Sequence, residues 1–101
     1  MLTSNAIDGF KKYTQNNIAF AKFKVGSTYY QVDIHKKEVL SDGRLAVYVL
    51  IDDKIPGDIT ISEIQLYDID SKLWLTKTEN ISKKAVQEGI LYRFTFEFEE
   101  R

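Results

Sequence analysis

The pattern of apolar and polar positions divides the chain into one helical segment followed by strands. Over residues 3–15, apolar side chains recur every three or four positions, the spacing of one face of an α-helix. These side chains are Leu2, Ala6, Ile7, Phe10 and Tyr13. The hydroxyl of Thr3 or Ser4 is suited to cap the first turn. Because Gly9 in a helix interior costs about 1 kcal/mol relative to alanine, we expect this helix to depend on docking.

From Ile18 onward the period changes to two, which is typical of strands. Six strands are predicted, at about residues 18–25, 28–35, 44–51, 59–67, 73–78 and 90–99. The connecting turns are predicted at Gly26-Ser27, Ser41-Asp42-Gly43 and Asp68-Ile69-Asp70-Ser71, and a solvated loop at residues 52–58. The alternation slips near Ser62-Glu63, which predicts a bulge.

Two of the predicted strands carry most of the apolar surface. The last strand places Ile90, Tyr92, Phe94, Phe96 and Phe98 on one face, and alternates them with Leu91, Arg93, Thr95, Glu97 and Glu99. We therefore expect Phe96 to be a core residue. The strand over residues 45–51 is apolar on both faces, so it requires cover from both sides. The simplest architecture is a single mostly-β domain over residues 1–101. We predict an antiparallel β-sandwich with the N-terminal helix laid against one face or end.

Composition narrows the class of partner. The chain has 101 residues with 14 Lys and Arg against 15 Asp and Glu, a formal net charge of −1. This balance argues against nucleic-acid binding, which needs a basic surface. No apolar run approaches the roughly 20 residues that cross a bilayer. Asp8 and Gly9 stand where a signal peptide carries its apolar run, so we expect synthesis in a cytoplasm without export.

The residues offer little for catalysis, and we expect no enzymatic activity, no cofactor and no metal. There is no cysteine, and His35 is the one histidine, so a zinc site of several nitrogen or sulfur ligands is excluded. Asp68 and Asp70 lie two residues apart on a predicted turn. A calcium site needs about six oxygen ligands, so an aspartate that bonds its own turn is the better interpretation.

Aromatic residues are the better candidates for function. Phe10, Tyr29, Tyr48 and Trp74 are predicted as possible interface residues, since tryptophan and tyrosine dominate the energetics of protein interfaces. Each of them could instead fill the core. Trp74 alternates with Leu73 and Leu75, so it is the one most in excess of the core's needs.

The order of patterns in the second half resembles a known viral family. A strand ending Glu63-Ile64-Gln65-Leu66-Tyr67-Asp68 precedes a turn, the short strand at residues 73–78, a polar stretch and the long strand at residues 90–98. This order resembles the N-terminal modules of bacteriophage tail-fibre and baseplate-associated proteins, where a run like "EIGLFD" stands at the first strand. At the front, residues 2–6 resemble the family's "LTNAG" run, and residues 23–27 its "IAVGTG" run. Gln65 and Ser27-Thr28 depart from the family's glycines.

The resemblance implies a non-enzymatic structural protein of the virion, located in the phage tail and acting as a tail-fibre or baseplate attachment module. It also implies assembly with other phage tail proteins and self-association, commonly as trimers. Two alternatives from other classes stay open. One is a carbohydrate-binding β-sandwich that stacks sugars on Trp74 and tyrosines. The other is a generic cytosolic interaction domain.

Overall fold

The computed structural model describes residues 3–52, 57–84 and 89–98, in one helix and six strands. The elements are α1 (Ser4–Asn17), β1 (Ile18–Val25), β2 (Thr28–Val39), β3 (Leu45–Asp52), β4 (Ile59–Asp68), β5 (Leu73–Lys83) and β6 (Gly89–Phe96). The predicted helix and six strands are confirmed. β2 and β5 are four and five residues longer at their C-terminal ends than the sequence pattern indicated. Glu99 and most of the predicted loop at residues 52–58 lie outside the described residues.

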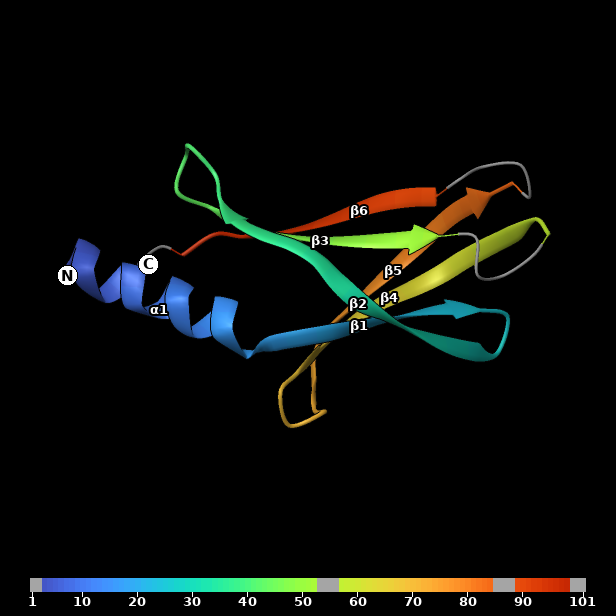
Figure 1. Cartoon of the computed structure of the whole chain (residues 1–101), viewed down its shortest axis with the longest axis horizontal. Helices are drawn as coiled ribbons and strands as arrows, with labels where there is room; N and C mark the ends of the chain where they lie inside the picture. Colours follow the sequence, from blue (N-terminus) through green and yellow to red (C-terminus); the bar gives the residue numbers. More distant parts are fainter. Residues whose placement is uncertain (1–2, 53–56, 85–88, 99–101) are drawn as a thin grey trace.

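The six strands form one sheet in the order β5-β4-β1-β2-β3-β6, and every neighbouring pair is antiparallel. Figure 1 shows this sheet strongly twisted and curled into a half-barrel. The predicted sandwich of two facing sheets is not confirmed. The curl buries one face of the sheet, as a second layer would, because it turns that face toward the interior.

The inward face of this half-barrel is the core. It consists of Ile18, Ala21, Phe23, Leu45, Val47, Val49, Ile51, Ile59, Ile61, Ile64, Leu66 and Phe94. β3 supplies four of these residues and is apolar on its outward face too, as predicted. Outward cover is partial: Ala46 is buried and Tyr48 half-buried, but Leu50 is exposed. Long side chains from neighbouring strands, such as Lys36 over the Tyr48 ring, provide this cover in place of another layer.

Three local predictions are confirmed by the backbone. The pairing of β4 with β5 shifts between Ile61 and Glu63, which is the expected bulge. Gly43 has a φ of 89° in the turn between β2 and β3, where a residue other than glycine is strained. Along β6, the predicted inward residues are buried or half-buried, and Leu91, Arg93 and Thr95 are exposed.

The helix lies at one end of the sheet, which is one of the two placements that the prediction allowed. α1 begins at its cap Thr3, whose Oγ1 accepts a hydrogen bond from the backbone N–H of Ala6 at 3.1 Å. Figure 1 shows α1 extending beyond the end of the sheet. Its one buried residue is Thr14, so the apolar stripe with Phe10 and Tyr13 does not pack on the core. The helix therefore docks through its C-terminal end and leaves its apolar face uncovered.

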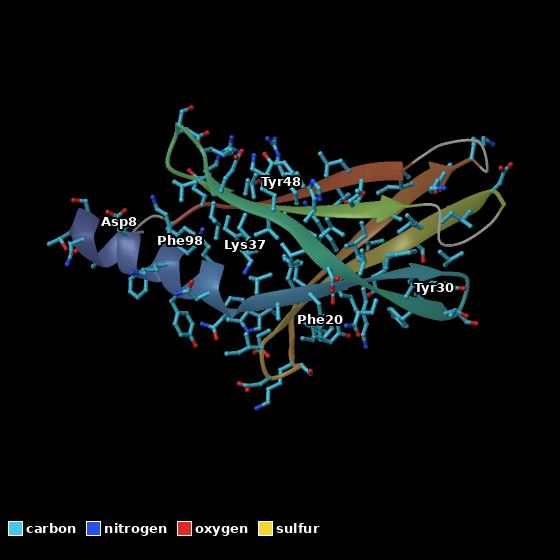
Figure 2. The ribbon with its side chains drawn as sticks, in the orientation of Figure 1. Asp8, Phe20, Tyr30, Lys37, Tyr48 and Phe98 are labelled. Carbon is cyan, nitrogen blue, oxygen red and sulfur yellow. The ribbon has the colours of Figure 1, made fainter. Side chains whose placement is uncertain are left out.

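Lys37 holds that end of the helix. It points inward from β2, and its Nζ donates hydrogen bonds to the backbone carbonyls of Gln15 at 2.5 Å and Ile18 at 2.6 Å (Figure 2). The last turn of α1 has no basic residue of its own, so a cation from the sheet occupies the negative end of the helix dipole. Burial lowers the pKa of Lys37.

The different burial of two aromatic residues on β6 gives a test of the core. Phe94 is 2% exposed, whereas Phe96, which we expected to be a core residue, is half-buried near the end of the strand. Phe94→Ala is expected to lower the free energy of unfolding by about 3–5 kcal/mol, because it leaves a cavity in the core. Phe96→Ala should cost less. Urea denaturation of both variants measures this, and equal losses would contradict the burial described here.

Candidate interaction surface

The uncovered face of α1 is the main candidate for function. Ala6, Gly9, Phe10 and Tyr13 line an open groove of about 550 Å³ along this face. Phe10 is 52% exposed and Tyr13 is 63% exposed, although side chains of this kind are normally well buried. The floor of the groove is accessible, since a Cβ added at Gly9 would meet no atom within 4 Å. An apolar side chain from outside could therefore rest on the helix backbone between the two rings.

This groove continues onto the sheet through a contact between two aromatic rings. The rings of Tyr13 and Trp74, from the start of β5, have centroids 6.2 Å apart and are tilted by 30°. Trp74 is 38% exposed. We call Ala6, Gly9, Phe10, Tyr13 and Trp74 together the aromatic surface. Ile69 and Leu73, which precede Trp74 in the sequence, are also exposed.

The turn between β4 and β5 fixes the position of Trp74. The Asp68 carboxylate accepts hydrogen bonds from the backbone N–H groups of Asp70 and Lys72 and from Nε1 of Trp74, at 2.9, 3.0 and 2.9 Å. This is the turn-forming aspartate that the sequence predicted, with an indole as a third donor. The backbone N–H of Ile69 also donates to the carbonyl of Asn17 at 3.0 Å, which ties the turn to the end of α1.

The four predicted interface residues do not form one site. Phe10 and Trp74 both contribute to the aromatic surface, whereas Tyr29 and Tyr48 lie elsewhere. Tyr29 is next to Tyr30, which Figure 2 places at the opposite end of the molecule from α1. Its hydroxyl donates to Glu63 at 2.6 Å, and this bond raises the pKa of Tyr29. Tyr48 lies on the outward face of β3 and donates to Glu38 at 3.1 Å.

Sequence reasoning assigned Tyr13 to the buried stripe of the helix and so missed it as a surface residue. The sequence of the stripe did contain a hint of exposure. Glycine has no side chain to pack against a core, but next to the rings of Phe10 and Tyr13 it leaves space for a groove. What the sequence lacked was the position of the sheet, which meets α1 at its C-terminal end and leaves this stripe uncovered.

Possible metal ligands do not converge among the described residues. Within residues 3–52, 57–84 and 89–98, no three His, Asp or Glu side chains are arranged to hold a metal ion. His35 is exposed on β2. The buried polar residue that stands out is Lys83, which is 1% exposed and opposite Ile59 in the sheet. Its Nζ has no hydrogen-bond partner among the residues that the structure describes, which is unusual for a buried amine.

Comparison with known proteins adds no family to these observations. No protein-family model, no curated protein and no solved structure matches the chain. A search of the described residues for a helix of sufficient length and apolarity to cross a membrane also found none. Inferences about function therefore rest on the residues and their arrangement.

The Asp68 turn gives a prediction with a defined pH dependence. Hydrogen bonds from the backbone N–H of Lys72, then from Asp70 and Trp74, lower the pKa of Asp68 below its ordinary value of 3.8. The ionised carboxylate therefore stabilises the fold above about pH 4, and this contribution is lost as the pH falls through the lower pKa of the folded state.

Asp68→Asn should lower the melting temperature at pH 7, and the difference from the unmodified protein should shrink below pH 3.8. Thermal unfolding followed by circular dichroism between pH 2 and 7 measures this. Asp70→Asn is the matched control, since its carboxylate is not the acceptor of these bonds. A difference that is independent of pH would contradict the assignment.

Lys83 gives a second prediction about stability. Lys83→Met keeps the length of the side chain and removes the unpartnered amine, so it should raise the free energy of unfolding by about 1–3 kcal/mol. Lys77→Met, on the same strand but exposed, is the control and should have little effect. Loss of stability in Lys83→Met would show that the amine has a partner that stabilises the fold.

Proposed function

We propose that this chain is a non-enzymatic structural module of a bacteriophage tail fibre or baseplate, which acts by docking onto protein surfaces, a second copy of itself first among them. The observation that carries the proposal is the aromatic surface. A short helix with two exposed rings has little to stabilise it alone. A protein that works as a unit of assembly gains that stability from its neighbours.

The shape and charge of the aromatic surface favour a second copy as its occupant. The same face presents a groove with a small-residue floor, at Ala6 and Gly9, and a projecting ring at Phe10 that fits such a groove. Asp8 and Lys12 are both exposed beside it, so two copies can place opposite charges next to each other. The net charge of −1 opposes association very little.

The area of the surface sets the strength of the contact. Phe10, Tyr13 and Trp74 are 52%, 63% and 38% exposed. With roughly 200 Å² per aromatic side chain, these rings offer about 300 Å² per copy. A stable interface buries about 800 Å² on each side. Ile69 and Leu73 can extend the contact, but we expect the aromatic surface alone to associate weakly, at micromolar concentrations.

The phage setting comes from the sequence resemblance, which runs from residue 2 to residue 98. It implies trimers and attachment to other tail proteins. A ring that enters a neighbour's groove can close as a two-fold pair or as a three-fold ring, so the surface is compatible with either. The carbohydrate-binding alternative draws on the exposed Tyr13 and Trp74 rings. It has less support, because Nε1 of Trp74 and the Asp68 carboxylate already bond to each other.

The proposal predicts self-association that depends on the groove. The double variant Phe10→Ser/Tyr13→Ser should have a clearly lower average mass than the unmodified protein at equal concentration, measured by light scattering across a dilution series. Leu50→Ser removes another exposed apolar side chain far along β3 and is the matched control. Its mass should be unchanged. Circular dichroism checks that the helix is retained.

A mass that is equal in the double variant and the unmodified protein would contradict docking through this surface. The phage assignment has its own test. Purified phage particles from the source of this sequence should contain the chain in fixed ratio to other tail proteins, by quantitative mass spectrometry. Its absence from purified particles would contradict the tail assignment and leave the docking surface standing.

A further inference from the structure

The two edges of the sheet differ in how they are protected against pairing with another strand. β5 carries Lys77 and Lys83, and its pairing with β4 shifts register twice. Inward lysines and bulges are the usual devices that stop an edge from accepting a further strand. β6 has no lysine or proline, and it pairs with β3 over eight consecutive residue pairs without a shift. The β6 edge is therefore regular and unprotected.

The curl of the sheet leaves most of this edge accessible. The hydroxyl of Tyr92 donates to Glu79 at 2.5 Å and connects the inward faces of β6 and β5 at the middle of β6. Figure 1 shows β5 and β6 diverging toward the C-terminal end of β6, so that within the described residues this half of β6 pairs with β3 on one side and with no strand on the other. The unpaired backbone groups of this half are available to a new strand.

We propose that β6 pairs antiparallel with β6 of a second copy, with the two-fold axis at Thr95. This register places Arg93 opposite Glu97 of the other copy, twice over by symmetry. The inward positions place Phe94 opposite Phe96, and Tyr92 opposite Phe98. Charge pairs and aromatic pairs directly across two strands both stabilise a sheet. The two sheets would thus become one sheet of twelve strands.

The charged residues of this edge are Arg93, in β6, and Glu97, directly after it. The pKa of Glu38 on β2 is lowered chiefly by its hydrogen bonds with Lys36 and Tyr48, and the charge of Arg93 adds a smaller effect. Arg93 and Glu97 are both exposed, and neither forms an ion pair with another residue in the part of the chain described here. A shift of the register by two residues places Arg93 opposite Thr95 in one direction and opposite Glu99 in the other. The register centred on Thr95 combines the Arg93–Glu97 pairs with an aromatic partner for Tyr92, whereas the register that pairs Arg93 with Glu99 places Tyr92 opposite Glu100.

This pairing rests on the proposed self-association but uses a different surface. The aromatic surface offers too little area for a stable contact by itself. Backbone pairing along β6 adds hydrogen bonds and further buried area. Two separate contacts also let an assembly grow beyond a single closed pair. Either contact can fail without the other, so the two are tested apart.

Charge reversal tests the register. In the Phe10→Ser/Tyr13→Ser background, where the aromatic surface is disabled, the protein should form a dimer. Adding Arg93→Glu or Glu97→Arg places like charges opposite each other, and each should raise the dissociation constant about tenfold. Sedimentation velocity measures the dimer, and the melting temperature of the monomer shows that each variant is folded.

Mixing the two variants is the decisive step. An Arg93→Glu chain and a Glu97→Arg chain have opposite charges in both pairs, so an equimolar mixture should recover the dimer as a heterodimer. The double reversal Arg93→Glu/Glu97→Arg should recover it within one chain. A background protein that stays monomeric at millimolar concentration would overturn the proposal, as would dimers that neither reversal weakens. Weakening without recovery in the mixture would overturn the register.

Discussion

The rest of the structure depends on one constraint: a single sheet has to bury its own apolar face. In the described part of the chain, no second sheet or helix covers the inward side chains, so the sheet curls until the residues of β3, β4 and β6 meet across the interior. Burial of apolar area is the main favourable term in folding. In a chain of this size the curl is the arrangement that buries enough of it without a second layer.

The curl determines what remains exposed at the edges and at the end of the sheet. Since it stops short of a closed barrel, two strands remain as edges, and these edges are not equivalent. β5 has the lysines, the bulges and the buried amine of Lys83, while β6 is regular and carries aromatic residues inward. At the end of the sheet, Lys37 donates hydrogen bonds to two backbone carbonyls at the C-terminal end of α1. The helix is held at one end, and its aromatic face stays in solvent.

Two of these features are the support for the proposal that the chain acts by assembly. An aromatic face that is not needed by the core, and an edge strand with no protection, are each a liability in a protein that acts alone. They are useful in a component of a larger particle, which is the role that we propose. The polar clusters of the molecule, by contrast, serve local structure: Asp68 shapes a turn, and Tyr29 and Tyr48 bond to neighbouring glutamates.

Local pattern determined the elements of this protein. The helix cap at Thr3, the turn at Gly43, the bulge at Glu63 and the alternation of β6 follow from interactions between residues close in sequence or across one hairpin, so the sequence predicted them. Only the tertiary structure decided that the sheet curls instead of stacking, that Tyr13 faces solvent beside Trp74, and that Lys83 is buried. These outcomes depend on contacts between distant strands and on the total apolar area to be covered. The periodic pattern of a sequence gives no information on either.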